Sequence, residues 1–165
     1  MMRSTLIAVL TLGCVSAALA EWRGSTGIDP MTDHKSASAQ APFGPSRQPT
    51  VVFKCWDHGG ILLGIVTGFY NDTVAYAPTL VTFRVDQHLP LKLVATAKNI
   101  DGLLALNVRS DEAVALLPLL AQIRDAKSRI ALSVGDALFQ SDVQGAAQAV
   151  SKMFALCGLK EPAAD

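Results

Sequence analysis

Cys55 and Cys157 constrain the fold of this chain more than any other feature, because the sequence turns both cysteines toward an interior. Thr50 to Trp56 has the two-residue period of a β-strand, with Val51, Phe53 and Cys55 on one face. A second series has the spacing of one buried helix face: Ala146, Ala149, Val150, Met153, Phe154 and Cys157. The two periodicities predict a disulfide that joins an early strand to the C-terminal helix, with two buried free thiols as the alternative.

The first twenty residues have the features of an export signal. Arg3 supplies the positive start, Leu6 to Leu12 the apolar centre, and Ala18-Leu19-Ala20 a small-x-small cleavage site. Cleavage near Ala20 places the mature chain in the periplasm or outside the cell, where disulfides persist. The apolar run is shorter than the about 20 residues of a membrane-spanning helix, so we expect no integral span in the mature chain. A lipoprotein anchored at Cys14 is the alternative.

Charge and length exclude some classes of function. The chain holds 14 basic and 14 acidic residues, and no short window is rich in Lys or Arg. It therefore lacks the basic stripe that phosphate backbones require, and we expect no nucleic-acid partner. The length suits one domain, and a hydrophobic content of 50% supplies a core of ordinary size. The sequence leaves the oligomeric state open.

Composition divides the mature chain into three parts. Residues 21–48 are rich in Gly, Ser, Ala and Pro and hold few large apolar side chains, which predicts a loosely ordered arm. An alternation from Asp33 to Ala41 allows an edge strand within that arm. Residues 49–160 carry the patterns of a single α+β domain, and residues 161–165 are expected to form a disordered tail.

Strand patterns dominate the first half of the domain. A hairpin is expected from Thr50–Trp56 and Ile61–Thr67, joined by a turn at Asp57-His58-Gly59-Gly60. Further strands are expected at Thr79–Val85, Leu91–Ala97 and Leu103–Val108. Their short spacing predicts an antiparallel meander of hairpins.

Two helices and one more hairpin follow. A helix is expected after Ser110, with a kink or a break at Pro118, and a hairpin is expected over residues 128–140. The final helix is expected to open on a Ser141–Gln144 capping box and to end at Gly158. The predicted fold class is therefore α+β, a mainly antiparallel sheet packed by two helices.

No group of residues in the sequence indicates catalysis or metal binding. The histidines are His34, His58 and His88, and none stands at the spacing of a helical metal site. Asp57-His58 could be half of a proton-transfer pair, but a Gly-rich turn uses Asp and His for backbone reasons, and we prefer that interpretation. Phosphate-binding and serine-hydrolase motifs do not occur. We predict no catalytic residue, no metal ligand and no cofactor.

Arg84, Asp86 and Trp22 are the candidate partner-binding residues. Arg84 lies on the face of its strand opposite the apolar positions, from which its guanidinium could bind a partner's carboxylate through two hydrogen bonds. The alternative is an ordinary surface or cross-strand ion pair, which contributes little energy. Trp22 is also large enough to pack back onto the domain.

A set of short motifs extends along most of the mature chain. Trp22 comes early, and the later members follow in the order Asp29-Pro30-Met31-Thr32-Asp33, Val51 to Cys55, Arg84-Val85-Asp86, and Phe139 to Cys157 with Gly145 and Ala149. With these motifs the chain resembles the small periplasmic accessory proteins of type VI secretion (VasI or TagO type) and, more loosely, other exported proteins of unknown role. The resemblance implies an envelope-associated accessory or binding role and names no ligand.

Three classes of function remain open at this stage. The leading hypothesis is an exported, non-enzymatic accessory or binding protein of the bacterial envelope, with an envelope or secretion protein as its partner. An inhibitor of a wall-degrading enzyme such as lysozyme is the second, because such inhibitors are also small, exported, β-rich and disulfide-bonded. An uncharacterised periplasmic enzyme is the third, and it needs a pocket that gathers Asp, His or Arg side chains distant in sequence.

Overall fold

The computed structural model describes residues 21–44, 49–70, 78–100, 103–108 and 113–160. The export signal, Cys14 and the C-terminal tail lie outside these residues. Within them the chain forms one antiparallel sheet of nine strands in the order β1-β2-β3-β4-β7-β6-β5-β8-β9, together with two helices. The strands are β1 (Arg23–Ile28), β2 (Lys35–Pro42), β3 (Thr50–Trp56), β4 (Ile61–Tyr70), β5 (Pro78–Val85), β6 (Leu91–Ile100), β7 (Leu103–Val108), β8 (Ile130–Val134) and β9 (Ala137–Ser141). The helices are α1 (Ala113–Asp125) and α2 (Ala146–Cys157).

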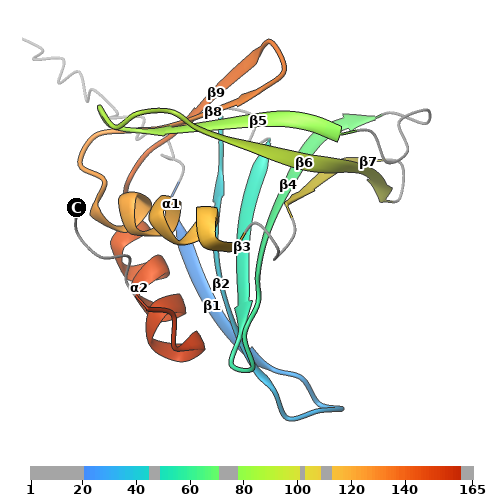
Figure 1. Cartoon of the computed structure of the whole chain (residues 1–165), viewed down its shortest axis with the longest axis vertical. Helices are drawn as coiled ribbons and strands as arrows, with labels where there is room; N and C mark the ends of the chain where they lie inside the picture. The colour runs from blue at the N-terminus through green and yellow to red at the C-terminus, as the bar shows by residue number, and fades with distance from the viewer. Residues whose placement is uncertain (1–20, 45–48, 71–77, 101–102, 109–112, 161–165) are drawn as a thin grey trace, which may run out of the picture.

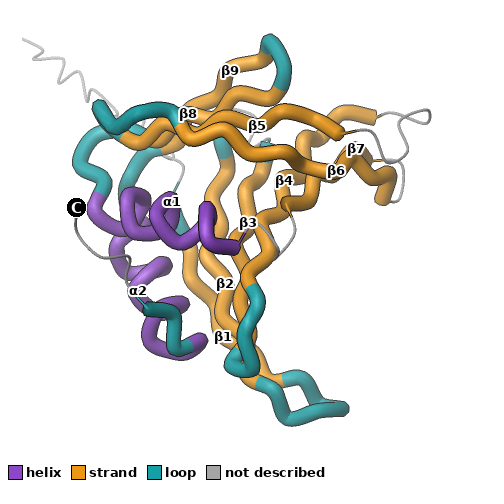
Figure 2. Tube along the Cα trace, in the orientation of Figure 1, coloured by secondary structure: helices purple, strands orange, loops and turns teal. Residues whose placement is uncertain are grey.

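The sheet bends into a half-barrel with the helices on its concave side (Figures 1 and 2). The α+β class, the strands from β3 to β9 and the two helices are confirmed. The pairing is not a simple meander, because β4 pairs with β7 and β5 pairs with β8. Strands β1 to β4 follow one another as neighbours, and so do β5 to β7, but β7 rather than β5 lies beside β4, so the chain passes across β7 and β6 between β4 and β5.

Residues 21–44 are part of the sheet, and the prediction of a loosely ordered arm there is wrong. β2 lies between β1 and β3, so β1 rather than β2 forms the edge. Ala37, Ala39 and Ala41 of β2 are fully buried under α2. A Cβ added at Gly24 would stand 2.9 Å from the Cα of Ala149. The small residues that suggested looseness are therefore the ones that let a helix pack closely on the strands.

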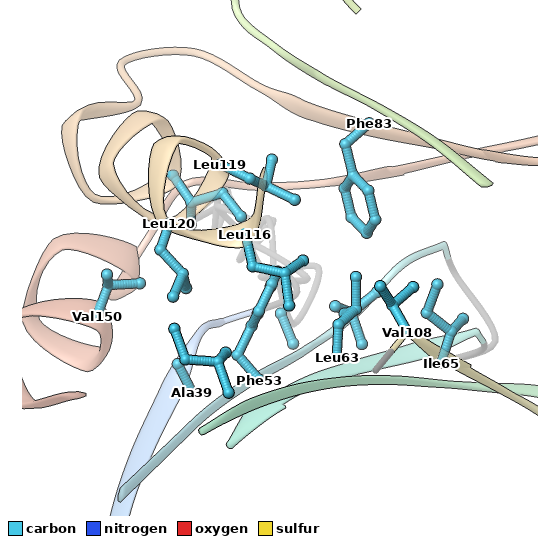
Figure 3. Close-up of a cluster of buried hydrophobic side chains, with 14 of the residues drawn as sticks. Ala39, Phe53, Leu63, Ile65, Phe83, Val108, Leu116, Leu119, Leu120 and Val150 are labelled. Carbon is cyan, nitrogen blue, oxygen red and sulfur yellow. The ribbon is translucent and has the colours of Figure 1, made fainter. Parts of the chain in front are cut away.

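Leucines of α1 fill the concave side of the half-barrel. Leu116, Leu119, Leu120 and Ile123 are buried, and Figure 3 shows the three leucines between the sheet and Val150 of α2. Aromatic rings continue this core in a chain of contacts, with centroid separations of 6.2 to 6.4 Å among Trp22, Phe43, Phe53 and Phe83. Burial of each such side chain contributes about 1.5 to 3 kcal/mol of transfer free energy.

Helix α1 runs as one element through Pro118, rather than as two short helices. Proline removes one backbone donor, and the buried leucines on both sides of it hold the helix against the sheet. The expected cap at Ser110 lies outside the described residues.

Helix α2 begins differently from the prediction. Ser141 ends β9 and its hydroxyl donates to the Asp142 carbonyl, so there is no capping box. Instead the Asp142 carboxylate accepts the Val143 and Gln144 N–H groups at 2.6 and 3.2 Å, and Gly145 enters the helix at φ 80°. The C-terminal end is as predicted, with Gly158 in the left-handed conformation and its N–H on the Phe154 carbonyl. All six predicted inward positions of the helix are buried.

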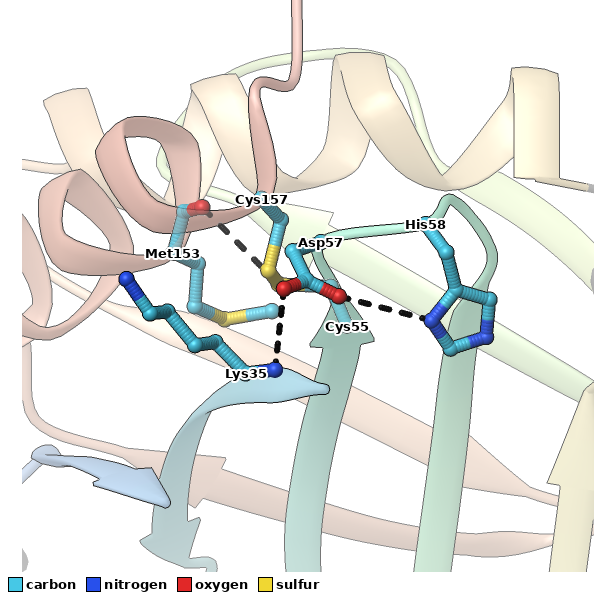
Figure 4. The surroundings of a disulfide bond; sticks show 6 residues. All are labelled: Lys35, Cys55, Asp57, His58, Met153 and Cys157. Carbon is cyan, nitrogen blue, oxygen red and sulfur yellow. Dashed lines mark hydrogen bonds and ion pairs between the residues drawn. A yellow bond between two sulfur atoms is a disulfide. The ribbon is translucent and has the colours of Figure 1, made fainter. Parts of the chain in front are cut away.

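The predicted disulfide is confirmed. Cys55 of β3 and Cys157 at the end of α2 are bonded, with Cα atoms 6.1 Å apart and a sequence separation of 102 (Figure 4). The bond joins the last turn of α2 to β3, an inner strand of the sheet.

Candidate functional site

Arg84 lies on the outer side of the sheet, as its strand position predicts. Its neighbours Phe83 and Val85 point into the core, whereas the Arg84 side chain is exposed. Among the residues that the structure describes, no carboxylate forms an ion pair with Arg84. The cross-strand ion pair that we considered as an alternative is therefore not formed within that part of the chain.

Exposed apolar side chains share this side of the sheet with Arg84. Leu80 pairs with Val94, and Thr82 lies in one row with Lys92, Ser133 and Leu138. Leu80, Val94 and Leu138 are each more than half exposed. We call the surface made by these residues and Arg84 the outer face; it belongs to β5, β6, β8 and β9 and is turned away from α1 (Figure 1).

Asp86 is engaged within the molecule. Its carboxylate accepts hydrogen bonds from the Lys127, Ser128 and Arg129 N–H groups at 2.7 to 3.0 Å and from the Ser128 hydroxyl at 2.7 Å. The Arg129 N–H first, and then the Ser128 hydroxyl, hold the pKa of Asp86 well below its usual range. Asp86 itself has a left-handed backbone conformation, with φ 48°. Its hydrogen bonds therefore connect the turn after β5 to the loop before β8.

Trp22 is in the core. Its ring is 2% exposed and packs on Phe43 and Phe53, and its Nε1–H donates to the Asp142 carbonyl at 3.0 Å. Its backbone N–H donates to the Gln144 carbonyl at 2.8 Å. Trp22 thus packs back onto the domain, and its indole is covered in this structure.

The tips of two hairpins bring together a group of polar side chains that the sequence separates. His34 precedes β2, while Asp57 and His58 follow β3. The Nδ1 atoms of His34 and His58 lie 3.2 and 3.5 Å from the same Asp57 oxygen, Oδ1, and the two imidazole centroids are 4.2 Å apart. We call these three residues the His-Asp-His cluster.

Asp57 is held in place from the neighbouring strand. Its second oxygen, Oδ2, accepts the Lys35 N–H at 2.9 Å (Figure 4). The Asp57 N–H donates to the Lys35 carbonyl at 3.0 Å. The Lys35 N–H, followed by the two histidines, holds the pKa of Asp57 below its usual range. The carboxylate is therefore ionised near neutral pH and presents Oδ1 to both imidazoles.

The sequence does not reveal this cluster through ligand spacing, because its histidines do not have the spacing of a helical metal site. His34 is 23 residues from Asp57, and only the antiparallel pairing of β2 with β3 makes them neighbours. A signal was available: Asp33 to Ala41 alternates like a strand, and a hairpin with Thr50–Trp56 would bring His34 beside Asp57. Within the described part of the chain, these residues form a group of His, Cys, Asp or Glu side chains close enough to share an ion.

The arrangement separates a filled interior from a polar surface. The concave side, where a half-barrel can hold a ligand, contains the leucines of α1. The side chains of the His-Asp-His cluster are exposed on the surface, where solvent and small solutes can reach them. Over the described residues, no helix has the length and apolar content needed to cross a membrane.

Comparison of this chain with protein-family models, with curated proteins and with solved structures finds no match.

Proposed function

We propose that this protein is an exported, non-enzymatic accessory or binding protein of the bacterial cell envelope, and that it binds its partner protein through the outer face. The observation that carries the proposal is the combination on that face of the exposed Arg84 with the exposed Leu80, Val94 and Leu138. Arginine is enriched among the residues that contribute most to protein interfaces, and exposed apolar side chains are stabilised when a partner removes them from water.

The disulfide supports the exported location. Cysteine pairs are oxidised and persist in the periplasm and outside the cell, whereas the cytosol keeps them reduced. The Cys55–Cys157 bond is consistent with such a compartment. It also agrees with the export signal that the sequence predicts.

The packed interior of the half-barrel supports binding of the partner protein at the outside of the molecule. Leu116, Leu119 and Leu120 occupy the concave side, so we expect a partner to bind an outer surface of the protein and not the inside of the half-barrel. On the outer face Arg84 and Lys92 provide positive charge beside the apolar side chains. The expected partner presents carboxylates next to an apolar surface, and the resemblance to type VI secretion accessory proteins suggests an envelope or secretion component.

Affinity capture from periplasm tests the proposal with matched variants. The mature protein should retain one reproducible partner, and Arg84→Ala and Leu138→Ser should each reduce its recovery at least about tenfold, as interface anchors do. Gln148→Ala, an exposed position of α2, is the control and should leave recovery unchanged. All three variants should keep the melting temperature of the wild type, because the replaced side chains are at the surface.

Two results would count against the outer face. Equal recovery of the partner by the wild type and the Arg84→Ala variant would remove Arg84 from the interface. Loss of recovery with Gln148→Ala alone would move the interface to α2. A lysozyme inhibition assay on the same proteins covers the alternative function, since inhibition that Arg84→Ala abolishes would identify the partner as a wall-degrading enzyme.

A further inference from the structure

We propose that His34, Asp57 and His58 form a binding site for a divalent transition-metal ion of the Zn²⁺ and Cu²⁺ class. The site is separate from the outer face, since it lies where β2 begins and β3 ends. It does not depend on the proposed partner, and its test needs only the protein and the ion.

The ligand spacing fits such an ion. A tetrahedral ion with ligand bonds of about 2.0 to 2.1 Å places its ligand atoms about 3.3 Å apart. The two Nδ1 atoms lie 3.2 and 3.5 Å from Asp57 Oδ1, and one ligand atom from each residue lies within 4.8 Å of the others. Both nitrogen–oxygen separations are therefore already close to the spacing of a tetrahedral ligand set.

The ligand types select the class of metal. Two imidazole nitrogens and one carboxylate oxygen suit Zn²⁺, Cu²⁺ or Ni²⁺, whereas Ca²⁺ and Mg²⁺ favour sets made of oxygen atoms. Cu²⁺ should bind more tightly than Zn²⁺, following the general order of stability for such ligands. The side chains of His34, His58 and Asp57 are 46%, 53% and 33% exposed, so the remaining coordination positions are open to solvent.

The backbone around the three ligands is already fixed, which lowers the cost of assembling the site. Asp57 is held by Lys35 through both the carboxylate and the main chain. His34 ends a turn in which its carbonyl accepts the Asp29 N–H at 2.9 Å. Strand β3, which ends directly before Asp57, is bonded to α2 through Cys55. Groups that hydrogen-bond to a metal ligand, as Lys35 does to Asp57, orient that ligand and raise the affinity for the metal.

Surface ion pairing of the histidines with Asp57 is the simpler explanation of the cluster. Such pairs contribute little energy when exposed. That explanation predicts no saturable metal binding, whereas the proposed site predicts one ion per chain. The two are distinguished by titration.

The experiment is a calorimetric titration of the untagged, oxidised mature protein with Zn²⁺, repeated with Ca²⁺ and Mg²⁺. One Zn²⁺ ion should bind per chain, and His34→Gln and His58→Gln should each weaken binding at least about tenfold. His88→Gln removes the third histidine of the chain and should have no effect. The melting temperatures of the variants without metal should match that of the wild type, because the replaced rings are exposed.

Fluorescence gives a second readout that is local to the site. The Trp56 and His58 rings lie 6.5 Å apart, so bound Cu²⁺ should quench Trp56 emission. His58→Gln should abolish the saturable part of the quenching, and Trp56→Phe should remove the signal while calorimetric Zn²⁺ binding remains. The absence of saturable Zn²⁺ binding up to 1 mM would overturn the proposal. Binding that survives the His34→Gln/His58→Gln double replacement, or that His88→Gln weakens equally, would also overturn it.

Discussion

Reduction of the Cys55–Cys157 bond should remove a large part of the stability of this protein. The bond closes a loop with a sequence separation of 102. In the chain-entropy model, a crosslink over about 100 residues restricts the unfolded chain by about 4.7 kcal/mol at 25 °C. Domains of this size have a net unfolding free energy of about 5 to 15 kcal/mol. The reduced protein should therefore keep almost none of that free energy if it starts at the lower end, and about two thirds of it if it starts at the upper end.

The native state should change little when the bond is reduced. Cys55 and Cys157 are both buried, and reduction keeps both sulfur atoms in the core, where they separate only from bonding distance to van der Waals contact. Helix α2 also keeps its packing through the buried Val150 and Met153. Reduction thus acts mainly on the unfolded chain, whereas a Cys55→Ala/Cys157→Ala variant would add a loss of buried sulfur and should be somewhat less stable than the reduced wild type.

Urea unfolding of the oxidised and the reduced protein measures this difference. With a slope of about 2 kcal/mol/M, the midpoint should fall by about 2 M on reduction. The slope itself should rise, because an unfolded chain without the crosslink exposes more surface, so free energies in water are the quantities to compare. Intact mass after alkylation without a reductant confirms the oxidation state of each sample.

A difference below about 1 kcal/mol, with both oxidation states verified, would refute the reasoning from loop length. Loss of the tryptophan bands from the near-ultraviolet circular dichroism of the folded protein on reduction, beyond the contribution of the disulfide itself, would also contradict it. That change would mean that the bond maintains native packing instead of restricting the unfolded chain.

Two further predictions concern single positions. Gly145→Ala should lower the unfolding free energy by about 3 kcal/mol in urea titrations, because a Cβ there overlaps the Trp22 carbonyl and φ is 80°. Gly135→Ala, also at positive φ but in open space, should cost about 1 kcal/mol, and an equal loss for both would contradict the overlap. Asp86→Asn should destabilise the protein at pH 7 by about 2 kcal/mol, because its hydrogen bonds to residues 127–129 lose their charge. Folding lowers the pKa of Asp86, so the ionised carboxylate stabilises the folded protein above the unfolded pKa near 3.9, and this stabilisation is lost as the pH falls below that value. The unfolding free energies of the wild type and of Asp86→Asn should therefore converge in acid. A constant difference between them from pH 7 to pH 2 would contradict this.

Several elements could be predicted because their signals are local. The two-residue period of β3 and the helical period of α2 each depend on residues a few positions apart. They placed Cys55 and Cys157 on buried faces, and the disulfide followed from that orientation. Arg84 was assigned to an outer strand face for the same reason.

Errors arose where a residue's role depends on a distant neighbour. The alanines of β2 were interpreted as an arm because nothing nearby in the sequence shows that α2 packs against them. Trp22 could not be assigned to the core without Phe43 and Phe53 around it. Ser141 and Gln144 match a capping box, yet β9 extends to Ser141 and leaves Asp142 and Gly145 to begin the helix.

The sequence by itself determined the strands from β3 to β9, the two helices and which of their faces are buried, since period and hydrophobicity are properties of neighbouring residues. The tertiary structure alone decided the strand order and the meeting of His34 with Asp57 and His58. It also decided that Arg84 shares a surface with Leu138. These arrangements depend on which distant strands pair, and strands with the same alternation can pair in many orders until the whole sheet closes around one core.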